Sequence, residues 1–375
     1  MGDTDRAAEQ TWIDAGLLDP DSPQADERRE LLAFLTELGV SLDTMVEACH
    51  DGQLVTVAGD RLLRPGDTFS VDELSRRSGV NDVAFATELR TATGFPPPVR
   101  ADEPVCTEDD VEMFRLFEAA SEVFSRDELL HFVRALGVSM RRVAEAAAEM
   151  FLRDVEASQH VAHATELQRA LTNIQAIELS SAATAVFAPM FRAHLVLAIG
   201  DARRARRHHH GYETTPLTVG FVDLTGFTGR AGSSTPTELL RLVTWFEATA
   251  HDLVTSHGGR LVKLIGDEVM FATVEPDQAC AIALALTRIA DMPARGGLAH
   301  GQVVTSGGDL YGPVVNLASR IADVAVPGEV LVDQAVVDAV RTDPHVRIEI
   351  DVEPAGRRQL KGFAEPVRLW SIGER

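Results

Sequence analysis

The sequence predicts two domains of different fold class: an all-α domain over residues 1–200, and a domain of mixed helices and strands over residues 214–375. The chain has 375 residues, which is more than one ordinary hydrophobic core serves. In the first part, apolar residues recur at helical spacing, as at Leu31, Leu35 and Leu38. From about Pro216, short apolar runs alternate with helical stretches, which is typical of α/β or α+β architecture.

The overall charge limits the class of partner. The 57 acidic residues outnumber the 35 basic ones, and the formal net charge is −22. Such a chain is repelled by nucleic acids and by anionic membranes. We therefore expect a small-molecule or protein partner and no nucleic acid.

The cysteines and the N-terminus predict the compartment. Cys49, Cys106 and Cys280 lie far apart and lack the spacing of a metal site, which fits a reducing environment. No basic and apolar leader opens the sequence, and no apolar run in it is judged long enough to span a bilayer. A cytoplasmic protein without a membrane span is the expectation.

Several helices are predicted in the first half of the chain. Residues 1–25 show little periodicity and are expected to form a loosely held arm. Further helices are expected from about residue 25 to Gly39, after the capping residue Thr107, and over 126–156, 158–177 and 181–200. Pro189 should kink or divide the last of these. We find no catalytic constellation in this half.

Residues 68–81 and the following stretch resemble a helix-turn-helix, which raises DNA binding as a rival function. A DNA-binding motif of this kind needs a basic face around its second helix. Residues 81–90 carry little positive charge. A packing or docking role is therefore favoured over DNA binding.

Residues 201–213 form the predicted linker. This segment contains Arg203, Arg204, Arg206 and Arg207, followed by the histidines at 208–210. A solvated helix end or linker is the favoured interpretation. The alternative is that the imidazoles, which titrate near neutral pH, act at a hinge between the domains.

The second half begins with a strand over 217–223 and a helix over 237–256 that ends at Gly258. Strands at 260–265 and 268–273 form a hairpin across Gly266. A helix near 277–290, a strand over 298–305, a helix near 314–325 and further strands complete the domain.

Two aspartates follow buried strands in this domain. Asp223 ends the first apolar run and Asp267 ends the run that starts at Leu261. A carboxylate just past a buried strand is poorly placed for packing. If the two strands are neighbours, these acids converge into a hard-oxygen site that suits Mg²⁺ or Mn²⁺.

Three segments in order, at 221–228, 263–268 and 309–320, resemble the catalytic domain of class III nucleotidyl cyclases. The resemblance covers residues 214–373, and it implies a ferredoxin-like α+β fold. The helical half resembles the N-terminal regulatory domain of some actinobacterial cyclases.

The resemblance implies roles for particular residues. Asp223 and Asp267 match the aspartates that hold two divalent metal ions, Mg²⁺ or Mn²⁺. Lys263 and Asp309 match the pair that binds the base, and an ammonium beside a carboxylate suits the acceptor and donor edge of adenine. This pair therefore favours ATP over GTP.

The remaining matches concern the ribose and the phosphates. Asn316 and Arg320 stand four residues apart in a helix, so they share one face. In the family the asparagine orients the ribose and the arginine stabilises charge on the α-phosphate. Lys361 matches a lysine that contacts the terminal phosphates. Lys263 and Lys361 are the chain's two lysines.

In the family, the metal aspartates and the other site residues come from different subunits, so the resemblance implies a homodimer with shared sites. The expected function is a signalling adenylate cyclase, a phosphorus–oxygen lyase that converts ATP into 3′,5′-cyclic AMP and pyrophosphate. The helical domain would regulate it in response to an unknown signal, such as a proton or an apolar ligand. The rivals are a guanylate cyclase and a silent nucleotide-sensing or docking module.

Overall fold

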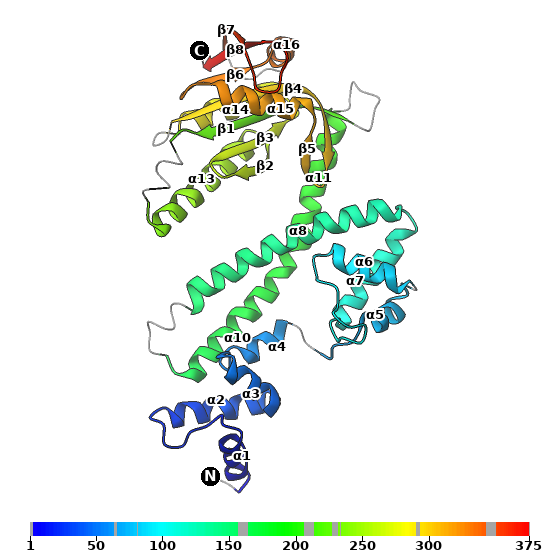
Figure 1. Cartoon of the computed structure of the whole chain (residues 1–375), viewed down its shortest axis with the longest axis vertical. Coiled ribbons are helices and arrows are strands. Elements are labelled where there is room, and N and C mark those ends of the chain that lie inside the picture. The colour runs from blue at the N-terminus through cyan, green and yellow to red at the C-terminus, as the bar shows by residue number, and fades with distance from the viewer. Residues whose placement is uncertain are drawn as a thin grey trace. The chain divides into compact units, whose positions relative to one another are not determined.

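The computed structural model describes residues 3–63, 66–80, 82–156, 164–205, 214–226, 232, 234–289, 293–342 and 350–374 (Figure 1). The chain divides into two compact units, Met1–Arg192 and Ala193–Arg375. This division falls within one helix, Phe187–Ala205, eight residues before the predicted domain end at 200. Of the predicted linker, 201–205 belong to that helix, and 206–213, with the three histidines, lie outside the described residues.

The secondary-structure elements described in the first unit are helices, as the sequence predicts, apart from an isolated β-bridge between Phe69 and Cys106. Its helices are α1 (Asp3–Asp14), α2 (Ala25–Glu37), α3 (Leu42–His50), α4 (Val57–Leu63), α5 (Val71–Ser78), α6 (Val83–Ala92), α7 (Glu108–Ser121), α8 (Arg126–Phe151), a π-helical turn η1 (Leu152–Glu156) and α10 (Glu166–Ala183). Ser125 caps α8 by accepting a hydrogen bond from the main-chain N–H of Glu128.

The expectation of a loosely held N-terminal arm is wrong. Residues 3–14 form α1, and Trp12, Leu17 and Leu18 are buried in a core that they share with α2, α3 and α4. The periodicity was weak because few side chains of α1 face this core. The buried ring of Trp12 and the side chains of Leu17 and Leu18 hold the segment in this core.

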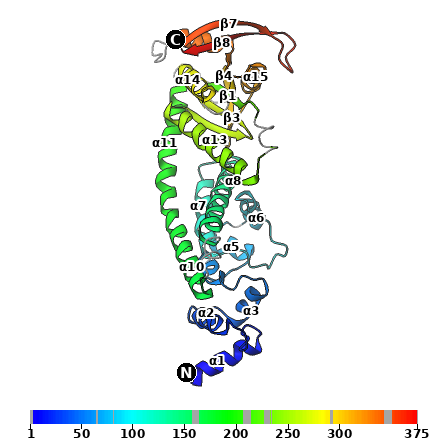
Figure 2. The ribbon, with the colours of Figure 1, turned by 90° about the vertical axis from the view of Figure 1, so that its left-hand side faces the viewer.

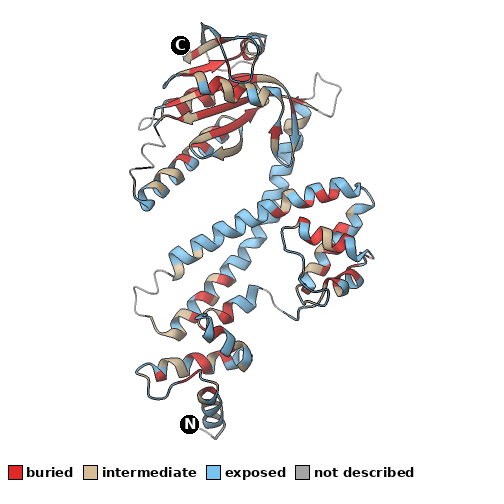
Figure 3. Cartoon of the chain, in the orientation of Figure 1, coloured by how far each residue is buried: buried red, intermediate tan, exposed pale blue. Residues whose placement is uncertain are grey.

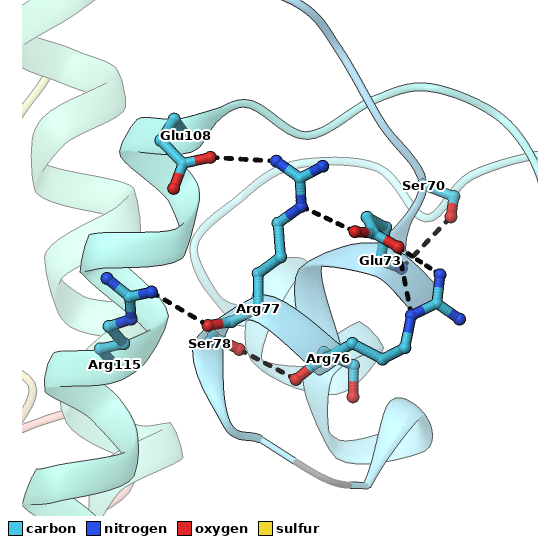
Figure 4. A network of polar contacts seen from close by, with 8 residues as sticks. Ser70, Glu73, Arg76, Arg77, Ser78, Glu108 and Arg115 are labelled. Carbon is cyan, nitrogen blue, oxygen red and sulfur yellow. Dashed lines mark hydrogen bonds and ion pairs between the residues drawn. The ribbon is translucent and has the colours of Figure 1, made fainter.

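The arginines of the helix-turn-helix are engaged by acids of the same unit (Figure 4). Arg77 of α5 donates to Glu73 over 2.8 Å and to Glu108 of α7 over 3.1 Å. Arg76 also pairs with Glu73, and Arg115 of α7 donates to the main-chain oxygen of Arg77. Arg77 and Arg115 thus fasten α5 to α7, which agrees with a packing role for the motif.

A long apolar helical stretch contradicts one expectation. Helix α10, a 3₁₀ turn η2 (Thr184–Val186) and α11 (Phe187–Ala205) follow one another without a break, and Pro189 lies in the first turn of α11. Within the 40 residues Glu166–Ala205, an 18-residue window has a mean hydropathy of 1.6 and no buried residue. By length and composition this stretch is sufficient to cross a membrane, so the prediction that no apolar run is long enough was wrong.

The second unit is built on one mixed sheet with the strand order β2-β3-β1-β4-β6-β8-β7, and β5 pairs with β4. The strands are β1 (Thr215–Leu224), β2 (Arg260–Ile265), β3 (Glu268–Thr273), β4 (Ala294–Ser306), β5 (Asp309–Tyr311), β6 (Val330–Val332), β7 (Ile350–Arg358) and β8 (Val367–Glu374). The helices are the last part of α11, α13 (Pro236–Ser256), α14 (Pro276–Thr287), α15 (Pro313–Val324) and α16 (Gln334–Thr342). The first part of this unit, β1-α13-β2-β3-α14-β4 with the sheet order β4-β1-β3-β2, is the expected ferredoxin-like α+β fold.

Helices cover both faces of this sheet. Residues of α13, α14 and α16 share one apolar core with one face, and α15 packs on the other. Figure 2 shows α14 and α15 on opposite sides of β1 and β4, and Figure 3 shows the buried residues concentrated in the central strands. On the face that α15 covers, a Cβ atom added at Gly297 would lie 2.2 Å from the main-chain nitrogen of Ala322. Glycine is therefore required where β4 touches the backbone of α15.

Asp333, which joins β6 to α16, gives a stability prediction. It is 8% exposed and accepts a hydrogen bond from the main-chain N–H of Val336 over 2.9 Å. Burial raises its pKa to about 6. A carboxyl group whose pKa is raised by folding stabilises the fold at pH values below about 3.8, which is its pKa in the unfolded chain. This contribution is lost as the pH rises through about 6, its pKa in the folded chain.

We therefore expect Asp333→Asn, which keeps the cap, to be increasingly more stable than the native chain between pH 4 and pH 7. The gain is up to about 3 kcal/mol. Denaturant unfolding followed by tryptophan fluorescence across this range measures it. A difference that does not change with pH would contradict the burial argument.

Candidate functional site

Asp223 and Asp267 lie at the same edge of the sheet. Asp223 is near the end of β1, where its register partners are Glu268 on β3 and Arg295 on β4. Asp267 lies in the turn between β2 and β3, and its main-chain oxygen accepts a hydrogen bond from the N–H of Leu224 over 3.1 Å. The two strands that end at these acids, β1 and β2, are not neighbours, because β3 lies between them. The antiparallel pairing of β1 with β3 and the turn from β2 into β3 nevertheless bring the two acids to the same edge of the sheet.

Arg295 is a residue of this site that the sequence analysis did not identify. Its guanidinium donates to Asp223 Oδ2 over 2.9 and 3.1 Å, and to the main-chain oxygen of Asp323 at the end of α15 over 2.7 Å. The sequence does contain a sign of this role, because an arginine at the start of an apolar strand needs an anionic partner. Which acid it meets depends on the strand register.

The carboxyl groups at this edge repel one another. Burial, reinforced by the charge of Asp223, raises the pKa of Asp267. Burial raises the pKa of Glu268 to about 7, with further contributions from Asp223 and Asp323. Arg295 opposes both shifts. The site therefore carries more negative charge than its one guanidinium balances, which favours a bound cation.

These residues fit a hard divalent cation. Both aspartates offer carboxylate oxygens, which are the donors that Mg²⁺ and Mn²⁺ prefer. No group of three or more His, Cys, Asp or Glu side chains in the described part of the chain could hold a metal ion. A cation at Asp223 and Asp267 would complete its shell with water or substrate phosphate oxygens, as Mg²⁺ commonly does.

Lys263 and Asp309 form a second pair. Lys263 Nζ on β2 lies 2.6 Å from Asp309 Oδ2 at the start of β5. Asp309 also accepts a hydrogen bond from the N–H of Leu310 over 2.8 Å. Burial acts to raise the pKa of Asp309, but the hydrogen bonds from Lys263 and Leu310 outweigh it and lower the pKa. Both side chains are partly exposed, so this fixed ammonium and carboxylate can meet a ligand.

Asn316 and Arg320 lie on α15, one turn apart. The helix begins after Gly312 with Pro313 at its first position, which suits a helix N-terminus. Asn316 is exposed, and the half-exposed Arg320 pairs with Asp323 over 2.7 Å. Asp323 in turn accepts from Arg295, so α15 is linked through Arg295 to Asp223.

Lys361 lies in the turn between β7 and β8. Its side chain is exposed, while the neighbouring Leu360 is 1% exposed and anchors the turn in the core. Of the motif at 221–228, Phe227 and Thr228 lie outside the described residues. The site residues thus form separate groups: the metal acids, the Lys263–Asp309 pair, the face of α15 and the Lys361 turn.

The chain is similar to several known proteins. The family model described as the adenylate and guanylate cyclase catalytic domain matches residues 210–373. A protein from Mycobacterium tuberculosis named pH-sensitive adenylate cyclase is 30% identical over 398 residues, covering 99% of this chain and 94% of its own. A protein from Glutamicibacter nicotianae named adenylate cyclase is 28% identical over 76% of this chain and 74% of its own. An uncharacterized Mycobacterium tuberculosis protein is 32% identical over 92% of this chain and 90% of its own.

Proposed function

The chain belongs to the family of adenylate and guanylate cyclases, and from this premise we propose that it is an adenylate cyclase. The proposed reaction converts ATP into 3′,5′-cyclic AMP and pyrophosphate. The names of two relatives, each an adenylate cyclase, support this choice. We propose a cytoplasmic enzyme with no nucleic-acid partner, in accord with the net charge of −22.

The observation that carries the choice of ATP is the pair of Lys263 and Asp309 at 2.6 Å. Adenine offers an acceptor at N1 next to a donor at N6. An ammonium has only donors and an ionised carboxylate only acceptors, so the pair is complementary to that edge. Guanine presents the opposite order, and it would place donor against donor.

The direct test is incubation of the purified chain with ATP or GTP and Mn²⁺, followed by chromatographic detection of cyclic nucleotide. We expect cyclic AMP from ATP and at least about tenfold less product from GTP. Preferential formation of cyclic GMP would assign the chain to the guanylate cyclases. No product from either nucleotide would favour a silent nucleotide-sensing module.

Lys263→Glu should lower kcat/KM for ATP by at least about 10²-fold, because a carboxylate would then replace the ammonium at adenine N1 and leave this acceptor without a donor. Steady-state kinetics with both nucleotides measure the change. Arg368→Glu on β8 is the matched control, since it makes the same charge change at an exposed position. An equal loss in both variants would show that the effect is one of net charge.

The remaining residues are proposed to act on the ribose and the phosphates. Asp223 and Asp267 would hold two divalent cations, which when bound activate the ribose 3′-hydroxyl and neutralise phosphate charge. Asn316 would orient the ribose, and Arg320 would stabilise charge that develops on the α-phosphate. Lys361, exposed on its turn, would bind the terminal phosphates.

A homodimer with sites shared between subunits is part of this proposal. No hydrogen bond or ion pair between described residues joins the Lys263–Asp309 pair to Asp223 or Asp267. One chain thus carries two half-sites that are not joined to each other. A two-fold dimer can complete each site by combining one half-site from each subunit.

Regulation by the helical unit through residues 201–213 remains a proposal. The name of one relative, pH-sensitive adenylate cyclase, supports a proton as the signal. Histidines 208–210 are the groups in this segment that titrate near neutrality.

A further inference from the structure

Strand β2 carries a second basic residue that contacts the same turn as Lys263. Arg260, the first residue of β2, donates a hydrogen bond from its guanidinium to the main-chain oxygen of Gly308 over 2.8 Å. Gly308 directly precedes Asp309, whose carboxylate lies 2.6 Å from Lys263 Nζ. One strand thus holds two consecutive residues of this turn, the first by its main-chain oxygen and the second by its carboxylate.

A β-bulge allows both basic side chains to reach the turn. In a regular strand, side chains three residues apart point to opposite faces of the sheet. The pairing of β2 with β3 shifts its register between Leu261 and Lys263. The extra residue, Val262, changes the alternation, so Arg260 and Lys263 can both contact the turn between β4 and β5. Bulges are common beside active sites, where they redirect a side chain in this way.

The turn is tight, so its backbone determines where Asp309 lies. Ser306 of β4 pairs with Asp309 of β5, and the loop between them consists of Gly307 and Gly308. Their φ values are 56° and 85°, as a type I′ turn requires, and glycine adopts such angles without steric cost. In so short a loop, a displacement of Gly308 moves the next residue with it. The hydrogen bond from Arg260 therefore helps to fix the position of Asp309.

The charge of Arg260 also acts on Asp309. Burial acts to raise the pKa of Asp309, whereas the hydrogen bonds from Lys263 and Leu310, together with the charges of Lys263 and Arg260, lower it. An ionised carboxylate is the acceptor that the amino group of adenine needs. Arg260 thus supports both the position and the charge of Asp309.

We propose that Arg260 is a positioning residue of the base site, which holds the turn between β4 and β5 so that Asp309 stays beside Lys263 in the geometry that suits adenine. This role rests on the proposed function, since it requires the pair of Lys263 and Asp309 to bind the base. Arg260 acts through Asp309 and not on the reacting phosphates. Its loss should therefore change nucleotide binding and selectivity more than the chemical step.

Steady-state kinetics of the full chain with ATP and GTP test this role in Arg260→Met, which removes the guanidinium and keeps an aliphatic side chain. We expect KM for ATP to rise about fivefold with kcat nearly unchanged, because the base is held equally in the ground state and in the transition state. The preference for ATP over GTP should fall by a similar factor. Arg260→Lys, which keeps a charged donor, should stay within about twofold of the native KM. Arg368→Met, at an exposed position on β8, is the matched control and should behave as the native chain.

A double-mutant cycle shows whether Arg260 acts through Asp309. In a chain that already carries Asp309→Asn, Arg260→Met should change KM for ATP by less than about twofold. Three results would overturn the role of Arg260 alone: a native preference for ATP that Arg260→Met retains, effects of the two substitutions that add fully, or an equal loss of kcat with both nucleotides. A native chain that makes no cyclic AMP, or that lacks the preference for ATP, would overturn the proposed function and the role of Arg260 with it.

Discussion

Replacement of Asp223 by alanine is expected to reduce cyclic AMP formation by at least about 10³-fold, since a lost cation removes several kcal/mol of transition-state stabilisation. Asp223 and Asp267 are the carboxylates that meet at one edge of the sheet, and the loss of either leaves one ligand for the cations. Turnover of ATP with Mn²⁺ at saturating concentration measures the effect.

The controls for this experiment separate metal binding from folding. Alanine at 223 removes the partner of Arg295, whose side chain is 26% exposed, so it also disturbs the fold locally. Asp223→Asn preserves the shape and should lose activity nearly as fully. Asp252→Ala, which removes an exposed acid on α13, should behave as the native chain. A folded Asp223→Asn protein that retains native turnover would refute the proposed metal site.

The second large effect is recovery of activity when two inactive variants are mixed. Arg320→Ala alone should lose about 10²- to 10³-fold in kcat, as expected for a preorganised charge at the transition state. In a dimer with shared sites, one Asp223→Ala chain and one Arg320→Ala chain leave one intact site. Random pairing should then restore about a quarter of native activity, because half of the dimers are mixed.

Purification through two different affinity tags isolates the mixed dimers and should double the share of native activity that mixing restores. A mixture that stays at the sum of its two inactive components would show that each chain completes its site alone. Size-exclusion chromatography of the same samples checks that the chains still associate.

The sequence predicted the catalytic unit well because its motifs and its periodicity agree. The hairpin around Asp267 and the strand before Asp223 were expected within about two residues of their bounds. Short apolar runs flanked by glycine leave few alternatives. Arg295 was not predicted, because its role follows from the register of β1 against β4, which is a long-range property.

The helical half was harder to predict in detail. Residues 1–25 carry no clear period, yet Trp12 places α1 in a core built by residues distant in sequence. The last helix was expected to end at residue 200, whereas α11 continues to Ala205. The buried Oδ1 atom of Asn173 on α10, which has no hydrogen-bond partner in the described structure, could not be predicted either. An unsatisfied side chain is recognised only from its surroundings in the fold.

The contact at Gly297 has a mechanical consequence. Because the backbones of β4 and α15 touch there without an intervening side chain, the helix cannot slide along the sheet on its own. Two residues earlier, Arg295 clamps Asp223 and the end of the same helix. These contacts join strand, helix and acid, so a displacement of α15 would move Arg320 and Asp223 of one chain together. In the proposed dimer these two residues belong to different shared sites, and such a movement would therefore affect both sites at once.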